Sequence, residues 1–276
     1  MPRTNEKTRI VDHYDRVSPY YHSLWGEHIH HGYWIRGDES KETAQIQLIE
    51  HLARLAGIQQ GSEVLDIGCG FGGSSLFLAR KYGATTTGIT ISPVQVEMAS
   101  RAAAAAGAHS TFLLMDAEDL CFQKQFDLLW SVESISHYQN IEKFFASAAR
   151  FLKPGGTFAL TDWFKRENLS PNEYRKFIAP IDDGMMVELH TMDDYAAYLE
   201  SSGLQIVSRE VLTPQCAKTW DLGLDIVKDK AFWALAAQWG TEFLTYLRAF
   251  RAVRSAITSG AFVYGLFVAR APQLST

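Results

Sequence analysis

The sequence has few cysteines, no surplus of basic residues and no apolar run long enough to span a bilayer. The three cysteines, Cys69, Cys121 and Cys216, are odd in number and far apart, which argues against a structural zinc site and fits reduced thiols. With a net charge of −5, the chain lacks the clustered lysine and arginine that a nucleic-acid-binding face needs. The most apolar stretches, such as residues 231–240, are too short for a transmembrane helix, and the first residues lack an apolar signal-peptide core. We therefore expect a cytoplasmic protein with neither a nucleic-acid partner nor a transmembrane segment.

Helical and strand patterns alternate through the middle of the chain. Residues 43–56 have apolar side chains at helical spacing, Gly57 ends that pattern, and residues 63–67 form a short buried strand after it. Further strands are predicted at residues 85–90, 111–115, 126–131, 157–161, 204–212 and 261–269, with helices between them. This alternation predicts one α/β domain with a seven-stranded parallel sheet and helices on both faces.

The predicted strands divide the chain into a core and two additions. Residues 43–212 and 260–276 form the core. Residues 1–42 precede it as an N-terminal lid segment, and the mostly helical residues 213–259 form a cap over the substrate site, inserted before the last strand. Between the fifth and sixth strands, residues 162–189 have an irregular pattern.

A glycine-rich turn follows the first predicted strand. Asp66 ends the strand, and Gly68, Gly70 and Gly72 recur at alternate positions before a helix begins near Ser74. Glycines at such a place let the backbone approach a ligand closely, with the N–H groups of the helix exposed. The spacing differs from the G-x-G-x-x-G of dinucleotide-binding proteins, and the chain has no Tyr-x-x-x-Lys pair, which short-chain dehydrogenases require. The alternative is a tight turn that binds no ligand.

Five motifs in sequence order resemble those of class I S-adenosylmethionine-dependent methyltransferases: VLDIGCGFGGSS, GITISPVQ, MDAEDL, FDLLWSVESISHY and RFLKPGGTFALTDW. More narrowly, WGEHIHHGYW, GGSSLFLARKYGA and SGAFVYGLFVAR resemble γ-tocopherol methyltransferases and their small-molecule relatives. The resemblance implies a Rossmann-like sheet, S-adenosyl-L-methionine as the methyl donor, S-adenosyl-L-homocysteine as the product and a small-molecule methyl acceptor. A nucleic-acid methyltransferase is not expected, because the Asn-Pro-Pro-Tyr and Asp-Pro-Pro-Tyr motifs are missing.

For the methionine end of the donor, the resemblance implies binding by the glycine turn. Its residues Asp66, Gly68, Gly70 and Gly72 are expected to line that end. The backbone carbonyls of Gly68 and Ser131 are expected to accept hydrogen bonds from the ammonium group.

For the ribose and adenine, the resemblance points to the ends of the second and third strands. Most relatives place an acid where this chain has Thr90, but a hydroxyl together with the amide of Gln95 can still hydrogen-bond the ribose hydroxyls. Asp116 is expected to accept from the adenine amino group, and Ala117 to donate its N–H to the ring. The alternative role for Asp116 is that of an acid at a helix N-terminus.

Methyl transfer is mainly a problem of positioning, because the sulfonium already activates the methyl group. A phenol or carbon acid must also lose a proton, which calls for a base with a pKa near 7. His137, in the loop after the fourth strand, is the candidate base, and Asp162, at the end of the fifth strand, could orient or replace it. The alternative is that His137 only packs within its loop. Ser136 stands where cyclopropane synthases carry a bicarbonate-holding glutamate, so fatty-acyl cyclopropanation is not expected.

The cluster Glu27-His28-Ile29-His30-His31 has two possible interpretations: a metal site, or part of a lid over the cofactor. Its spacing is not that of a helical zinc site, and the resembling families carry a similar stretch in a segment that folds over the cofactor. We expect a lid that excludes water, in which Tyr14, Tyr20 and Tyr21 supply aromatic edges and Tyr14 contacts the cofactor. We expect no metal.

Aromatic residues are frequent after the fifth strand, and most of them fit ordinary packing. The tryptophans after the fifth strand are Trp163, Trp220, Trp233 and Trp239. A few of the aromatic residues in this part of the chain are expected to line an apolar acceptor pocket, as aromatic side chains often do. This favours an aromatic or prenylated acceptor over a sugar or a peptide. The resemblance makes a tocopherol-type phenol the first candidate and an indole- or alkaloid-type amine the second. Methylation on O, N or C stays open, as do a non-catalytic S-adenosylmethionine-binding protein and the choice between a monomer and a homodimer.

Overall fold

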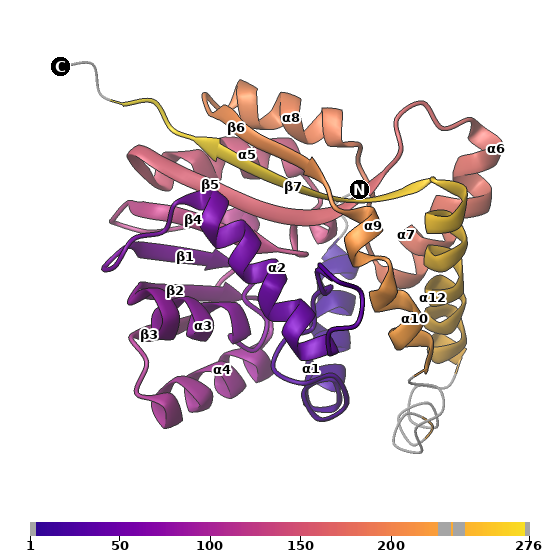
Figure 1. Cartoon of the computed structure of the whole chain (residues 1–276), viewed down its shortest axis with the longest axis horizontal. Helices are drawn as coiled ribbons and strands as arrows, with labels where there is room; N and C mark the ends of the chain where they lie inside the picture. Colours follow the sequence, from indigo (N-terminus) through magenta and orange to yellow (C-terminus); the bar gives the residue numbers. More distant parts are fainter. Residues whose placement is uncertain (1–3, 226–232, 234–240, 274–276) are drawn as a thin grey trace.

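A seven-stranded sheet forms the centre of the computed structural model, which describes residues 4–225, 233 and 241–273. The strand order is β3-β2-β1-β4-β5-β7-β6 (Figure 1). The strands are β1 (Glu63–Ile67), β2 (Thr85–Thr90), β3 (Ser110–Leu114), β4 (Phe126–Val132), β5 (Leu152–Lys165), β6 (Gln205–Val211) and β7 (Phe262–Arg270). The seven predicted strands are therefore confirmed, although β5 is longer than predicted at both ends.

The sheet is mixed rather than parallel throughout. Strands β1 to β5 pair in parallel, whereas β7 runs antiparallel to both β5 and β6. The start of β7 at Phe262 pairs with Lys165 at the carboxyl end of β5. The helices that precede β7 leave the chain at the carboxyl ends of the parallel strands. For this reason β7 begins at that edge and runs in the opposite direction. The sequence prediction of a parallel sheet is wrong for this strand.

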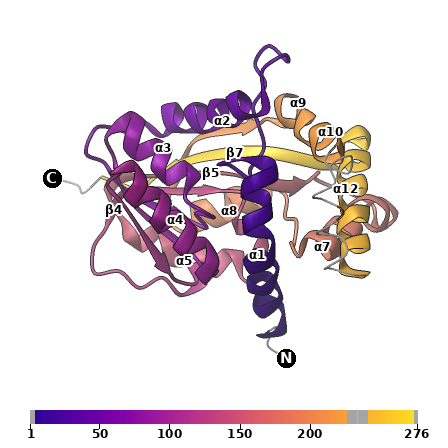
Figure 2. The same cartoon turned by 90° about the horizontal axis from the view of Figure 1, so that it is seen from below.

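Helices cover both faces of the sheet (Figure 2). Helices α2 (Lys41–Ala56) and α3 (Gly73–Tyr82) lie on one face, and α5 (Ile141–Ala148) and α8 (Met192–Ser201) lie on the other. Helix α4 (Pro93–Ala106) packs against β3, and the short η3 (Ala149–Phe151) continues from α5. The predicted Ser-Pro start of α4 is confirmed, because the Ser92 hydroxyl accepts from the backbone N–H of Gln95.

The segment after β5 differs from the prediction. Instead of an irregular stretch, β5 continues to Lys165, and three helical pieces follow: α6 (Pro171–Glu173), η4 (Tyr174–Ile178) and α7 (Ala179–Met185). Ser170 and Glu173 form a reciprocal capping box at the start. The spacing Ser-x-x-Glu, with proline after the serine, was a readable signal for this helix start.

Further helices gather beyond the carboxyl ends of the strands. Helix α12 (Thr241–Ser259) packs against α7 and α10 (Lys218–Asp225), and α9 (Thr213–Cys216) packs against β7. Helix α1 (Thr4–Trp25) crosses the same region, in indigo in Figures 1 and 2. Part of the predicted cap, including Trp239, lies outside the described residues. Among those described, no helix is both long and apolar enough to cross a membrane.

Candidate active site

A cavity of about 250 Å³ lies at the carboxyl ends of β1, β2 and β4, with α1 along one side. It brings together nine of the predicted site residues: Tyr14, Asp66, Gly68, Gly70, Thr90, Gln95, Asp116, Ala117 and His137. Three others, Gly72, Ser131 and Asp162, do not line it within the described part of the chain. The edge of the sheet is the one at which open α/β folds bind ligands.

The glycine turn brings its backbone close to the loop after β4. Gly68 has φ +74°, and a Cβ there would lie well inside 3.0 Å of Ser134 Cβ. Ser134 in turn donates its hydroxyl to the Ile67 carbonyl at 2.9 Å. At Gly70 a Cβ would meet only Ile29 Cδ1, at an ordinary contact distance of 3.7 Å, but φ of +53° favours glycine there. We call the backbone at Gly68 and Gly70 the cradle. Gly72 serves packing instead, because a Cβ there would approach Phe112 to 2.7 Å.

Asp66 lies buried beneath this turn. Its Oδ2 accepts a 2.6 Å hydrogen bond from the Ser75 hydroxyl in α3. Burial raises the pKa of Asp66 to about 7, against the opposing hydrogen bonds from Ser75. A cationic group bound at the turn would favour the ionised carboxylate, which matches the predicted place of the ammonium group.

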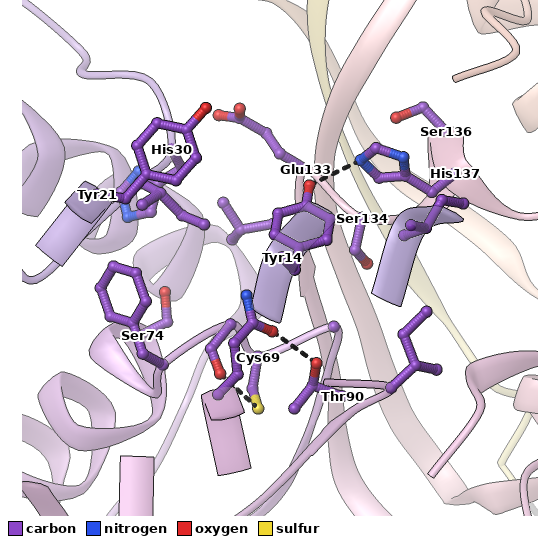
Figure 3. Close-up of a pocket in the computed structure, with 18 of the residues that line it drawn as sticks. Tyr14, Tyr21, His30, Cys69, Ser74, Thr90, Glu133, Ser134, Ser136 and His137 are labelled. Atoms are coloured by element: carbon purple, nitrogen blue, oxygen red, sulfur yellow. Dashed lines mark hydrogen bonds between the residues drawn. The ribbon is translucent and has the colours of Figure 1, made fainter. Parts of the chain in front are cut away.

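Thr90 and Gln95 form a preassembled polar pair in the cavity wall (Figure 3). The Thr90 hydroxyl donates to Gln95 Oε1 at 2.6 Å, and Gln95 Nε2 donates to the Ser18 hydroxyl of α1 at 3.1 Å. Both side chains are buried and uncharged. Because Thr90 Oγ1 also accepts from the backbone N–H of Ser92 at 3.3 Å, one lone pair on this oxygen and the second amide hydrogen of Gln95 are left for a diol.

Asp116 has the alternative of its two predicted roles, that of an acid at a helix N-terminus, and it also lines the cavity. Its Oδ1 accepts from the backbone N–H of Glu118 at 2.9 Å and so caps η1 (Ala117–Asp119). Its Oδ2 accepts from Lys7 Nζ at 2.5 Å, and Lys7 also pairs with Glu118 at 2.7 Å. The α1 helix is thus tied to the predicted adenine end of the cavity, a contact between residues 109 positions apart that sequence reasoning missed.

His137 lies in η2 (Ile135–His137), with both ring nitrogens engaged (Figure 3). Its Nδ1 lies 2.9 Å from the Met186 carbonyl, which can only accept, so Nδ1 carries the hydrogen. Nε2 is therefore the acceptor for the Tyr14 hydroxyl at 3.0 Å. Burial lowers the pKa of His137, only partly offset by the bond to Met186. A neutral imidazole with a basic nitrogen toward the cavity is the state a general base needs.

Asp162 lies inside β5 rather than at its end, and it is fully buried. Its carboxylate accepts from the backbone N–H of Ser136 at 2.9 Å and from the Tyr195 hydroxyl at 3.0 Å. Burial raises the pKa of Asp162 to about 7, against these donors. The residue therefore holds the backbone of the loop that carries His137, and it does not contact the imidazole.

The cavity also contains a carboxylate that the predicted site residues did not include. Glu133, directly after β4, has φ +53° and accepts four hydrogen bonds. Two come from the backbone and Nδ1 of His31, one from Trp163 Nε1 and one from the Tyr264 hydroxyl. Although burial disfavours the charge, the His31 ring and the hydrogen bonds from His31 lower the pKa of Glu133 to about 2.

The histidine cluster lies against the glycine turn and the cavity. His28 and His30 line the cavity with ring centroids 5.1 Å apart, and burial lowers the pKa of His28 to about 3. Ile29 is the side chain nearest to Gly70. The lid and the absence of a metal both stay predictions.

Aromatic side chains form the end of the cavity toward α10 and α12. Trp163 and Trp220 lie with ring centroids 5.4 Å apart, and Trp220 lies 5.0 Å from Phe250. All three line the cavity. Trp233, by contrast, is exposed.

The comparisons with known proteins agree with this geometry. The family described as mycolic acid cyclopropane synthetase matches residues 2–257. The chain belongs to this family. Tocopherol O-methyltransferase of Arabidopsis thaliana is 34% identical over 235 residues, covering 76% of this chain and 67% of that protein. The 27-O-demethylrifamycin SV methyltransferase of Amycolatopsis mediterranei (strain S699) is 31% identical over 278 residues, covering 99% of each.

A solved structure of a mycolic acid cyclopropane synthase has a fold similar to that of this chain. The crystal structure of the cyclopropane synthase CmaA1, complexed with SAH and CTAB, matches with a TM-score of 0.81 at 21% identity, covering 94% of this chain and 98% of that one. The predicted Rossmann-like fold is thereby confirmed. The chain is an S-adenosylmethionine-dependent methyltransferase, and the cradle at Gly68 with the Thr90–Gln95 pair fits this cofactor. The roles of the individual site residues stay predictions.

Proposed function

We propose that the enzyme methylates a hydroxyl oxygen of a small apolar acceptor, with a tocopherol-type phenol as the first candidate. The observation that supports this most directly is the Tyr14–His137 pair. In this pair, Nε2 of a neutral imidazole accepts a hydrogen bond from the Tyr14 hydroxyl, and Tyr14 lines the cavity. The aromatic end at Trp163 and Trp220 supports a ring-bearing acceptor. The tocopherol O-methyltransferase of Arabidopsis, by its name, supports the phenol.

S-adenosylmethionine, when bound, supplies an electrophilic methyl group whose bond to sulfur breaks as the bond to the acceptor oxygen forms. Asp66, Gly68, Gly70, Thr90, Gln95, Asp116 and Ala117 are the residues that would hold it. The acceptor oxygen must release its proton in this step. Tyr14 takes that proton on its oxygen and passes its own hydroxyl proton to Nε2 of His137. The positive charge lost from sulfur reappears on His137.

A second candidate acceptor is an alcohol on a larger natural product. The 27-O-demethylrifamycin SV methyltransferase matches this chain over nearly the whole length of both proteins, and its name places its methyl group on oxygen. This supports oxygen as the methylated atom for either acceptor. Cyclopropanation is not part of the proposal, because Ser136 has no carboxylate to offer.

The organisation of the chain completes the proposal. Residues 1–42 act as a lid, residues 213–259 act as a cap, and the rest is the catalytic core. The contacts of Lys7 and Tyr14 with cavity residues support the lid. The three free cysteines support a cytoplasmic location, whereas the tocopherol relative is named as chloroplastic.

Transfer of a labelled methyl group tests this function. Purified protein with labelled S-adenosylmethionine should place the label on the oxygen of a phenol or alcohol, with one S-adenosylhomocysteine formed per methyl group. Methyl ethers of the same compounds serve as controls and should accept no label. Label on an amine nitrogen or a ring carbon, with none on oxygen, would contradict the proposal.

A further inference from the structure

Glu133 fixes the hydrogen on one side of the His31 ring. With a pKa of about 2, the carboxylate has no proton to give, so Nδ1 of His31 must be the donor in their 3.0 Å hydrogen bond. The opposite nitrogen, Nε2, is buried and has no hydrogen-bond partner among the described residues. Whether that nitrogen carries a lone pair or a hydrogen, it is an unsatisfied polar atom in a residue that lines the cavity.

Three aromatic rings lie around the His31 ring. The His31 ring lies 4.5 Å from Tyr264, 5.3 Å from Trp220 and 5.6 Å from Trp163, measured between ring centroids. Trp220 adds a second unsatisfied atom, because its buried Nε1 lacks a partner in the described part of the chain. Gly223 lies about one turn after Trp220 in α10. A Cβ at Gly223 would approach Phe250 to 3.0 Å, so the glycine leaves space beside the Phe250 ring.

Two unsatisfied polar atoms amid aromatic faces call for a ligand that supplies a polar group on an apolar ring. A buried donor or acceptor without a partner loses the hydrogen bond it would make to water, so a ligand that pairs both atoms is favoured. A hydroxyl suits both atoms, because it accepts from the indole N–H and can donate to or accept from an imidazole nitrogen. A simple hydrocarbon ring would leave both unpaired.

We infer that His31 and Trp220 bind a second hydroxyl of the acceptor, apart from the one that is methylated at Tyr14 and His137. This inference rests on the proposed function and narrows its acceptors to compounds with two hydroxyls on an apolar skeleton, such as hydroquinones. A tocopherol-type phenol, which carries one hydroxyl, then falls outside the preferred acceptors. Glu133 acts as a positioning residue that holds the His31 ring. His31 and Trp220 then determine specificity, because the site rejects an acceptor that lacks the second hydroxyl.

Binding of two matched probes tests this inference. Protein saturated with S-adenosylhomocysteine is titrated anaerobically with 2,3,5-trimethylhydroquinone and with 2,3,5-trimethylphenol, which lacks one hydroxyl. The wild type should bind the hydroquinone at least about tenfold more tightly. Trp220→Phe keeps the aromatic ring and removes the N–H, whereas His31→Asn keeps a donor for Glu133 and removes Nε2. Either variant should reduce the preference to about twofold or less and leave the affinity for S-adenosylhomocysteine unchanged.

Trp130→Phe is the matched control. Trp130 is also buried with an indole nitrogen that lacks a described partner, but it lies in β4 and does not line the cavity. Its variant should keep the full preference. Equal binding of the two probes by the wild type, binding of neither, or a preference that survives in both site variants would overturn the inference. Failure of S-adenosylhomocysteine itself to bind would instead refute the proposed function.

Discussion

Replacement of His137 by alanine is expected to slow methyl transfer to a phenol by about 10²- to 10⁴-fold, the usual contribution of a general base. The variant removes the nitrogen that accepts from Tyr14, while the glycine turn and the Thr90–Gln95 pair stay in place. The affinity for S-adenosylhomocysteine should therefore change by no more than about twofold. Single-turnover rates and calorimetry together measure the two quantities.

A matched histidine and a pH profile separate catalysis from structure. His190→Ala, at a half-buried histidine that does not line the cavity, should leave the rate nearly unchanged. Because the pKa of His137 lies below its ordinary 6.5, the wild-type rate should stay level as the pH falls through 6.5 and decline only at lower pH. A rate for His137→Ala equal to that of the wild type, or a loss of cofactor affinity, would remove His137 from the role of base.

Replacement of Gly68 by alanine is expected to weaken S-adenosylhomocysteine binding by about 100-fold or more. The new Cβ would overlap Ser134, whose hydroxyl also contacts Ser131 and Tyr138, so the turn or the loop after β4 has to move. A displacement of about 1 Å at a binding site is enough for an effect of this size. Calorimetric titration of the purified variant measures it.

Gly57→Ala is the control for backbone strain alone. Gly57 has φ +69°, close to that of Gly68, but a Cβ there has open space and the residue ends α2 away from the cavity. This variant should lose about 1–2 kcal/mol of stability through the left-handed conformation and keep its cofactor affinity. Equal losses of affinity in both variants would mean that global destabilisation, and not the cradle, explains the effect at Gly68.

The elements that form the predicted cofactor end of the site could be predicted because their signals are local. A strand, a turn with spaced glycines and a helix are contiguous from Glu63 to Tyr82, and Thr90 and Gln95 are only five residues apart. Parallel strands then bring such strand ends to one edge, whatever the rest of the chain does. The capping of α4 by Ser92 was readable for the same reason.

The acceptor end was not predictable, because its contacts join distant segments. His31 and Glu133 are 102 positions apart, Tyr264 and Glu133 are 131 apart, and no spacing in the sequence links them. The full length of β5 could not be predicted either, because its extension to Lys165 depends on pairing with β7. For this reason Asp162, predicted at a strand end beside the substrate, lies buried within the strand.

Calorimetric titration of the purified wild-type protein with S-adenosylhomocysteine, and separately with NAD, tests the central claim that the turn after β1 and the Thr90–Gln95 pair hold S-adenosylmethionine and its demethylated product. The account predicts one binding site per chain for S-adenosylhomocysteine and no measurable binding of NAD. Binding of NAD without binding of S-adenosylhomocysteine would contradict it.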